Sequence, residues 1–592
     1  MVIDRRPRWA LAALLIVPAG LYTVGLSASG YGNPYYAAAA QAGARSWAAW
    51  FFGALDARGF ITVDKPPAAL WVTGLSVRLF GLSSWSVLAP QAVMGVAAVA
   101  LLYAAVRRTV PDPRAGTAAG LLAGLVLAVT PAAAVMFRFD DPDALLVLLL
   151  TAAGYAVTRA VATASGRWLA GAGALVGVAF LTKMAEAFLV LPALAAAYLA
   201  AAPTGWRAKA LHLAGAAAAL VGAAGWWVAV VALVPAHDRP YVGGSADDSV
   251  LDLAWGYNGV SRLVGRGSAV GGTVPRGTPW RLLTGEMGQE ISWLLPAAVL
   301  GCAGAGWLAL RGRLTRVERG ALVWWSGWLV VAAAVLTAMR GTQHAYYSVT
   351  LAPPVAATVA LAAVWAWREH SGTGRAVLAA LVLAGAGWSA MLLRHAGFRP
   401  APLVGLLAAA GVACAALILV PRWSPVGTAA GAVAALVGTV AFGVATAATA
   451  HEGVAPEAVT PPGAPAARSW TGDEATNADL ARLLAATSTP WSAATNGAQS
   501  AAVLELSSGT SVMAVGGWSG DPVPTLDAFV AAVHAHLVTY WVEAGRGGAA
   551  APHGEVLHAK DASASHTREI ADWVAAHHPA VAVGDSLVYR LS

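Results

Sequence analysis

Charged residues are scarce in this sequence. Only 11% of its 592 residues are Asp, Glu, Lys or Arg, whereas soluble globular chains carry about 25%. So few charges cannot cover the surface of a soluble protein of this length, which excludes a soluble enzyme, a disordered chain and a fibrous repeat. Hydrophobic residues make up 58% of the chain, and their long runs indicate a polytopic membrane protein.

Cysteine is almost absent as well. Cys302 and Cys414 both lie inside apolar runs, so the chain has neither a disulfide framework nor a cysteine metal site. The net charge of +7 would favour nucleic acid only if the basic residues were clustered. Their position therefore matters more than their sum.

Apolar stretches of roughly 20 residues between polar breaks predict about thirteen membrane-spanning helices. The spans are expected near 9–26, 87–106, 117–136, 144–161, 168–182, 187–202, 211–234, 291–310, 321–338, 346–366, 376–393, 402–420 and 427–449.

The loops between these spans differ in charge. With the amino terminus inside, the cytoplasmic loops hold 17 basic and four acidic residues, while the exterior part of residues 1–449 holds 14 basic and 12 acidic ones. Basic residues concentrate in cytoplasmic loops of membrane proteins. The sequence thus predicts a plasma-membrane protein with a cytoplasmic amino terminus, and its basic inner face makes nucleic acid an unexpected partner.

The composition changes after residue 449. Residues 450–592 hold 6 basic and 14 acidic residues and no spanning run. A Pro/Ala-rich linker at 450–470 precedes expected helices near 473–487, 525–535 and 566–577, and strand-like runs at 511–517, 536–542 and 586–591. We therefore expect an all-α membrane bundle at 1–449 and an extracytoplasmic α/β domain at 471–592.

The first long exterior loop, about 27–86, contains a charged cluster beside two prolines. Lys65 could hold a phosphate while Asp56 or Asp64 contacts a hydroxyl or a metal; a solvated loop with an Asp–Lys ion pair is the alternative. The stretch Ala68–Leu82 is apolar, too short to span and contains Arg78, which is typical of an amphipathic helix lying on a membrane.

A second cluster, "MFRFDDPD", places Arg138, Asp140, Asp141 and Asp143 at the outer end of the third span. Three carboxylates within four residues are typical of a divalent-cation site or an acid/base group. They are equally suited to capping the next helix.

Three further polar groups are expected at the exterior side. Lys183 and Glu186 share one face at the end of the fifth span, where a simple ion pair is the alternative. The exterior loop at about 235–290 offers cations, hydroxyls and aromatic faces suited to a sugar phosphate, with an ordered loop without ligand as the alternative. The candidates there are Arg239, Tyr241, Tyr257, Asn258 and Arg262, and those of the third group, "RGTQHAYYSV", are Arg340, His344, Tyr346 and Tyr347.

Several strings together carry a family resemblance. They are "GYGNPYYAAA", "RGFITVDKPPAALW", "RPYVGGS", "GYNG", "HAYYSV" and, in the exterior domain, "NGAQSAAVLELSSGTSVMAVGGWSGDP". A long first exterior loop with an acidic residue before KPP resembles the polyprenol-dependent GT-C glycosyltransferases, which include the protein O-mannosyltransferases and the lipid A aminoarabinose transferases. The full set is most similar to the YkcA/YkcB-like mannosyltransferases, over nearly the whole chain.

The resemblance implies inverting transfer of a mannose-like hexose or a pentose from a polyprenyl-phosphate donor to an extracytoplasmic glycan, lipid or protein. Lys65 falls on the motif lysine that contributes to donor-phosphate binding, and Asp64 falls on the acidic position before it. No cofactor is expected with certainty, although a divalent cation fits the carboxylates. The expected donor-binding residues are Lys65, Arg138, Lys183, Arg239, Tyr241, Tyr257, Asn258, Arg262, His344, Tyr346 and Tyr347.

One departure from the family concerns the general base. Where relatives carry an acidic pair early in the first loop, this chain has Gly32 and Asn33, and an amide does not accept a proton at neutral pH. We expect Asp56 as the base, with Asp64 or the group containing Asp140 and Asp141 as alternatives.

Two other classes of function remain as alternatives, a lipid or sugar transporter or flippase and a non-catalytic envelope scaffold. The glycine-rich string "GGWSGDP" in the exterior domain is interpreted as a tight turn rather than as a sugar or phosphate site, and it is left out of the expected catalytic set.

Overall fold

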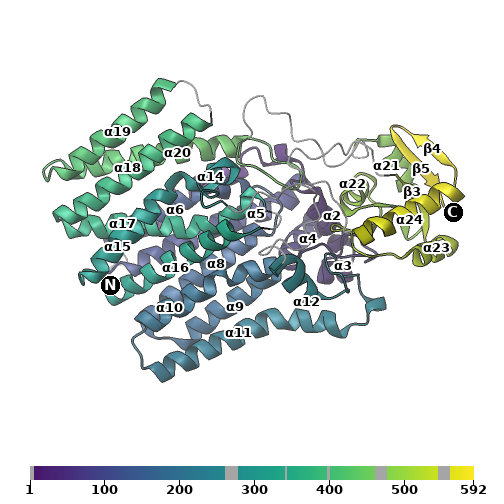
Figure 1. Ribbon diagram of the computed structural model, residues 1–592, viewed down its shortest axis with the longest axis horizontal. Helices are drawn as coiled ribbons and strands as arrows, with labels where there is room; N and C mark the ends of the chain where they lie inside the picture. The colour runs from purple at the N-terminus through teal and green to yellow at the C-terminus, as the bar shows by residue number, and fades with distance from the viewer. Residues whose placement is uncertain (1–5, 261–277, 341–342, 397–400, 460–475, 544–560) are drawn as a thin grey trace.

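The computed structural model describes residues 6–260, 278–340, 343–396, 401–459, 476–543 and 561–592. It has two parts, a large helical bundle and a small C-terminal sheet domain at one end of it, with α2, α3 and α4 between them (Figure 1). Since the predicted linker 450–470 extends into 460–475, most of it lies outside the described residues.

The bundle is formed by helices rich in Ala, Leu, Val and Gly. In the described part of the chain, eleven helical segments are long and apolar enough to cross a membrane, which makes this a multi-pass membrane protein. The bundle helices are α1 (Arg6–Thr23), α5 (Ser84–Thr109), α6 (Pro113–Val129), α7 (Pro131–Met136), α8 (Asp143–Thr163), α9 (Gly166–Lys183), α10 (Leu191–Ala201), α11 (Trp206–Leu233), α15 (Leu295–Leu310), α16 (Arg316–Ala338), α17 (Ala352–Glu369), α18 (Gly372–His395), α19 (Ala401–Leu419) and α20 (Ser424–Ala448).

Shorter elements connect the bundle helices and build the end that faces the sheet domain. They are η1 (Leu26–Ser29), α2 (Pro34–Arg45), α3 (Trp47–Phe52), α4 (Ala68–Phe80), η2 (Met184–Val190), η3 (Ala236–Asp238), α12 (Val250–Asp252), η4 (Leu253–Val260), α14 (Gly285–Ile291), η5 (Ser292–Leu294) and η6 (Ala345–Leu351).

The expected spanning segments are largely helical; one is divided and two others are joined. The segment expected at 117–136 is divided into α6 and α7 at Pro131, because proline has no N–H to continue the backbone ladder. The segments expected at 168–182 and 187–202 are joined by η2 into one helical run, Gly166–Ala201. The count of thirteen crossings stays a prediction.

Contacts at the two ends show that α9 and α10 run in opposite directions. Lys183, the last residue of α9, pairs with Asp143, the first residue of α8. At the other end, Arg316 donates hydrogen bonds to the carbonyls of Val161 in α8 and Ala201 in α10. The left-handed backbone of Met184 (φ 48°) allows the reversal between the two helices.

The first exterior loop begins with a capped helix. Asn33 accepts a hydrogen bond from the Tyr35 N–H, and Pro34 occupies the first position of α2, an arrangement that starts helices. The predicted amphipathic helix is confirmed as α4, and its last two apolar side chains, Leu79 and Phe80, are 74% and 78% exposed. Its position on a membrane stays a prediction.

The C-terminal domain is α/β, as predicted. Its sheet has the order β2-β1-β3-β5-β4, with β2, β1 and β3 parallel and the β3–β5 and β5–β4 pairs antiparallel. Its elements are α21 (Ala478–Ala485), β1 (Trp491–Asn496), α22 (Ala498–Ser508), β2 (Val512–Val515), α23 (Leu526–His534), β3 (Val538–Val542), α24 (Asp561–His577), β4 (Ala580–Val583) and β5 (Ser586–Arg590).

This domain packs on the first exterior loop. Leu504 of α22 lies in one apolar cluster with Tyr35, Leu55 and Ile61 of the loop. The Arg45 guanidinium donates a hydrogen bond to the Gly509 carbonyl, and the Trp491 indole N–H donates one to Asp56, at 3.2 Å. The sheet domain therefore covers the loop that carries the Asp64–Lys65 motif.

Candidate active site

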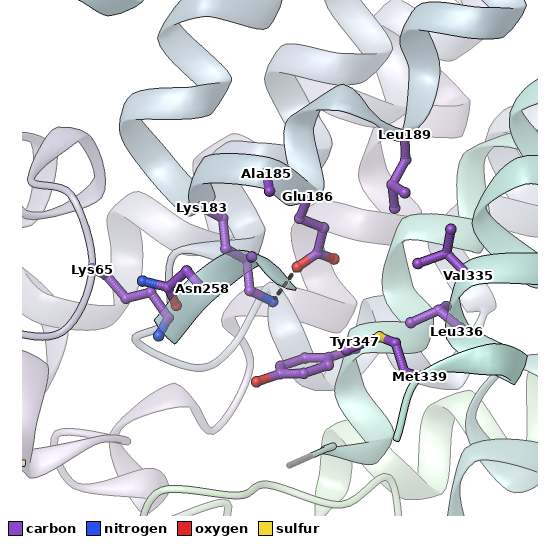
Figure 2. A pocket seen from close by; sticks show the side chains of 11 residues that line it. Lys65, Lys183, Ala185, Glu186, Leu189, Asn258, Val335, Leu336, Met339 and Tyr347 are labelled. Carbon is purple, nitrogen blue, oxygen red and sulfur yellow. Dashed lines mark ion pairs between the residues drawn. The ribbon is translucent and has the colours of Figure 1, made fainter. Parts of the chain in front are cut away.

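A cavity of about 700 Å³, including its part open to solvent, lies at this end of the bundle. Its lining divides into two halves. In Figure 2 the polar side chains lie on one side and the aliphatic ones of α16 and η2 on the other. The lining residues are Lys65, Lys183, Ala185, Glu186, Leu189, Asn258, Gly259, Val335, Leu336, Met339 and Tyr347.

Lys65 reaches this cavity from the first exterior loop and is only 8% exposed. Its ammonium group lies 2.7 Å from the Asp64 carboxylate and 5.4 Å from the centre of the Tyr257 ring. The Asn258 amide donates a hydrogen bond to the Asp64 carbonyl, at 2.9 Å. The motif and the loop after α11 thus form one wall of the cavity.

Lys183 provides a second buried ammonium group, 6% exposed, at the end of α9. It lies 2.6 Å from Asp143 and 3.1 Å from Glu186, and 4.0 Å above the centre of the Tyr347 ring. Burying a cation is costly unless opposite charge compensates it. Two carboxylates and a ring face provide that compensation here.

The carboxylates of "FDDPD" are buried but have different neighbours. Asp140 accepts hydrogen bonds from Gln91, at 2.9 Å, and Thr73, at 3.4 Å, and burial raises its pKa to about 8. Burial and the adjacent Asp143 raise the pKa of Asp141, while the Lys183 cation opposes that rise. Asp141 thus interacts electrostatically with the cavity lysine, while Asp143 pairs with it directly.

Tyr36 connects the two carboxylate segments. It is 7% exposed on α2, and its pKa is raised by burial and by the nearby Asp64 and Asp141 carboxylates. Its neighbour Tyr35 accepts a hydrogen bond from the Asp64 N–H through its hydroxyl, at 3.0 Å. Neither tyrosine is among the site residues predicted from the sequence, although both lie in the string "GYGNPYYAAA".

The remaining aromatic candidates pack together beside Lys183. Tyr346 and Tyr347 meet edge to face at 5.0 Å between ring centres, and His344 stacks on Tyr346 at 5.1 Å. Of the three, Tyr347 lines the cavity. The apolar lining from α16 was missed because nothing in its pattern distinguishes it from other spanning helices.

Other predicted residues serve the loops around the cavity. Both oxygens of Asp56 are occupied, since they accept hydrogen bonds from the N–H groups of Arg58, Gly59 and Phe60 and from Trp491. Burial raises the Asp56 pKa, and these hydrogen bonds lower it. In this arrangement Asp56 orders its own loop and anchors the C-terminal domain.

Three predicted donor-binding residues also make local contacts. Arg138 is buried and donates to the Leu21 carbonyl of α1, at 2.8 Å. Arg239 pairs with Asp248 at 2.6 Å, and the Tyr241 hydroxyl donates to the Ser245 carbonyl at 2.9 Å. None of the three lines the cavity described above, and their donor-binding role stays a prediction. Arg262 lies outside the described residues.

The expected divalent cation has no matching cluster in the part of the chain that the structure describes. There, no group of three or more His, Cys, Asp or Glu side chains could hold a metal ion. The carboxylates diverge instead, Asp140 toward Gln91 and Asp143 toward Lys183.

Comparison with known proteins confirms the family resemblance. Residues 64–228 match the family described as dolichyl-phosphate-mannose-protein mannosyltransferase, and residues 480–577 match that described as "Putative mannosyltransferase YkcB-like, C-terminal". Two separate segments of the chain, one beginning at the Asp64–Lys65 motif and one in the C-terminal domain, are thus similar to mannosyltransferase families.

Two similar relatives come from Bacillus subtilis (strain 168). "Putative mannosyltransferase YkcB" is 32% identical over 459 residues, which are 61% of this chain and 63% of the relative. "Putative mannosyltransferase YycA" is 31% identical over 433 residues, 59% of this chain and 62% of the relative. The match thus spans less than two thirds of either relative.

The fold is shared with solved GT-C structures. ArnT from Cupriavidus metallidurans, bound to undecaprenyl phosphate, has a TM-score of 0.55 at 18% identity, covering 100% of this chain and 99% of ArnT. The archaeal oligosaccharyltransferase AglB from Archaeoglobus fulgidus, in complex with an inhibitory peptide and a dolichol-phosphate, has a TM-score of 0.51 at 14% identity, covering 91% and 70% of the two chains. The chain thus has an ArnT-like GT-C fold.

Proposed function

We propose that this protein transfers a sugar from a polyprenyl-phosphate donor to an extracytoplasmic acceptor of the cell envelope. The observation that carries the proposal is the divided cavity. Lys65 and Lys183 provide two buried cations in its polar half, whereas Leu189, Val335 and Leu336 make the opposite wall apolar. A lipid phosphate has the same division between an anionic head and a hydrocarbon chain.

The two lysines would bind the donor phosphate. Each ammonium group has a carboxylate at 2.6 to 2.7 Å. A bound phosphate would accept hydrogen bonds from the same ammonium groups, beside these carboxylates. Charge-assisted hydrogen bonds from lysine stabilise the negative charge that grows on the phosphate as the glycosidic bond breaks.

Asp141 is our choice for the general base. A Cβ atom on Gly32 would lie 3.1 Å from the Asp140 backbone nitrogen, so the "DDPD" segment lies directly beside the Gly32–Asn33 position. In the proposed reaction the acceptor hydroxyl oxygen attacks the anomeric carbon, its proton moves to Asp141, and polyprenyl phosphate leaves with the bonding electrons.

The named relatives support this class of reaction. Both Bacillus proteins are described as mannosyltransferases, and the ArnT structure contains undecaprenyl phosphate. We propose a mannose-like hexose or a pentose as the sugar and a glycan, lipid or protein as the acceptor. We also propose that the cavity and the C-terminal domain face the cell exterior.

Purified full-length protein in lipid nanodiscs would test the activity, using a panel of radiolabelled polyprenyl-phosphate sugars and a cell-envelope acceptor fraction. We expect label transfer from one donor and a loss of roughly 100-fold in Lys65→Ala, the scale of removing one charge-stabilising donor. Lys209→Ala is the matched control, because Lys209 is half-buried and donates to the Leu199 carbonyl at the opposite end of the bundle. Full transfer by Lys65→Ala would refute the site, and no transfer from any donor would refute the function.

A further inference from the structure

A glycine-rich loop of the C-terminal domain, residues 516–521, reaches the Asp64–Lys65 pair from outside the membrane bundle. Gly516, Gly517 and Gly520 all have positive φ angles of 55° to 79°, which confirms the tight turn. The turn presents two side chains, Trp518 and Asp521, to the exterior loops of the bundle.

Trp518 acts through Tyr35. The two rings lie 4.5 Å apart between centres, and the Tyr35 hydroxyl accepts the hydrogen bond from the Asp64 backbone N–H. The C-terminal domain thus fixes the ring whose hydroxyl holds the backbone of the motif. In the folded protein, Tyr35 alone links Trp518 to the Asp64 backbone in this series of contacts.

Asp521 acts through Gly244. It is 4% exposed, and its Oδ1 accepts hydrogen bonds from the Gly244 N–H, at 2.9 Å, and from Ser519, at 3.3 Å. Gly244 has a φ of 84°, and a Cβ atom there would lie 3.4 Å from the Asp64 Cβ and 3.5 Å from the Tyr257 ring. The Gly243–Gly244 turn therefore packs closely between Asp521 and the side chains around Lys65.

Burial of the Asp521 carboxylate is energetically unfavourable. Its second oxygen is buried and has no hydrogen-bond partner among the described residues. Burial and the nearby Asp64 carboxylate together raise its pKa to about 7, against the lowering effect of the hydrogen bonds from Gly244 and Ser519. Two further titratable groups that interact with Asp521 are Tyr35 of α2 and Tyr241 of the loop after α11.

We propose that Asp521 and Trp518 are positioning residues of the donor site, which hold Asp64 and Lys65 in place through Gly244 and Tyr35. The inference rests on the proposed function, because the pair must bind the donor phosphate for its position to matter. It gives the C-terminal domain an indirect part in donor binding, through the position of the two motif residues. The membrane domain alone would have an incomplete site.

Binding of undecaprenyl phosphate to the purified full-length protein in nanodiscs tests this proposal. Asp521→Ala removes the acceptor of the Gly244 hydrogen bond, and we expect its dissociation constant to rise at least tenfold. Asp521→Asn keeps an acceptor oxygen while removing the charge, so it should bind as tightly as wild type or more tightly. Trp518→Ala should weaken binding and Trp518→Phe should restore it.

Arg45→Ala is the matched control. It removes the interdomain hydrogen bond to the Gly509 carbonyl and touches no cavity residue, so its affinity should stay within twofold of wild type. Unchanged binding by Asp521→Ala and Trp518→Ala, equal losses in Arg45→Ala, or equal losses in Asp521→Ala and Asp521→Asn would each overturn the positioning role.

These outcomes are separable from failure of the proposed function. If wild type binds and transfers but the two alanine variants do so equally well, only the positioning role is wrong. If wild type does not bind the lipid phosphate, the donor-site assignment fails and this inference fails with it. Thermal unfolding of each variant shows whether it is folded. Where an alanine variant does not fold, the binding of the conservative variants Asp521→Asn and Trp518→Phe tests the positioning role instead.

Discussion

Two lysines, Lys65 and Lys183, are buried at the cavity end of the helical bundle. An unpaired buried ammonium group would be destabilised by several kcal/mol, and each lysine is held by carboxylates, Lys65 by Asp64 and Lys183 by Asp143 and Glu186. Ionisable groups kept at the edge of a bilayer at such cost are typical of functional sites. The lysines and their carboxylates thus form a site that can exchange one anionic partner for another.

Asp141 should determine the acid limb of the pH–rate profile. Its pKa is raised by burial and by Asp143, and a base must be ionised to act, so the rate should rise with pH above the ordinary carboxyl range near about 4. Lys183 favours the ionised form, and Lys183→Gln should therefore move the limb to higher pH. Rates of sugar transfer measured across the pH range would show both effects.

The same residue should dominate the chemical step. Asp141→Asn should lower kcat by roughly 10²- to 10⁴-fold, the usual contribution of a general base. Asp238→Asn, an exposed carboxylate of the same exterior region, is the control. An Asp141→Asn enzyme with at least half the wild-type kcat would show that another group takes the proton.

At the scale of elements, α9 and α11 approach closely through glycines. A Cβ atom on Gly173 would lie 2.1 Å from the Ala216 carbonyl oxygen, and one on Gly177 would lie 2.5 Å from that of Leu220. Small residues at such contacts let membrane helices pack backbone to backbone. Because Lys183 ends α9, this contact also positions the second cation of the cavity.

Gly173→Val should therefore reduce both stability and donor affinity. Overpacking costs about 1–3 kcal/mol, so the midpoint of thermal unfolding in detergent should fall by several degrees. Gly171→Val is the matched control in the same helix, because nothing lies within 4 Å of a Cβ at Gly171. Equal midpoints for the two variants would contradict a close α9–α11 contact.

At the scale of the whole molecule, positive and negative charges are concentrated in different parts of the chain. Residues 1–449 account for a net charge of about +15 and residues 450–592 for about −8, so the overall +7 describes no single surface. The carboxylates gather at the end that holds the cavity and the C-terminal domain, and the loop arginines gather at the opposite end. The distribution of basic residues predicts that the cavity end faces outward.

Cysteine labelling would test this orientation. In a background lacking Cys302 and Cys414, a membrane-impermeant maleimide should label Asp238→Cys in intact cells. Arg313→Cys should react only after permeabilisation, since Arg313 is exposed next to Arg316 at the opposite end. The reverse pattern would place the cavity in the cytoplasm and would contradict an extracytoplasmic acceptor.

The sequence pointed to residues that the structure places in the cavity, and their donor-binding role stays a prediction. Lys65, Lys183 and Asn258 were predicted to bind the donor, and all three line the cavity, because charge and amide groups beside apolar spans are conspicuous. Asp56 was expected to act as base, but its four hydrogen bonds come from its own loop and from Trp491. The residues around Asp56 contain no pattern that predicts its hydrogen bond with Trp491, which is 435 residues away in the chain.

The sequence by itself determined that this is a membrane protein with a C-terminal α/β domain, because hydropathy and strand patterns depend on neighbouring residues alone. Only the tertiary structure decided which charged groups share a cavity and which serve loops. It also decided that a turn of the C-terminal domain contacts Gly244 and Tyr35, the residues that pack against the Asp64–Lys65 motif. These are contacts between segments hundreds of residues apart, and packing in three dimensions, rather than the composition of either segment, brings them together.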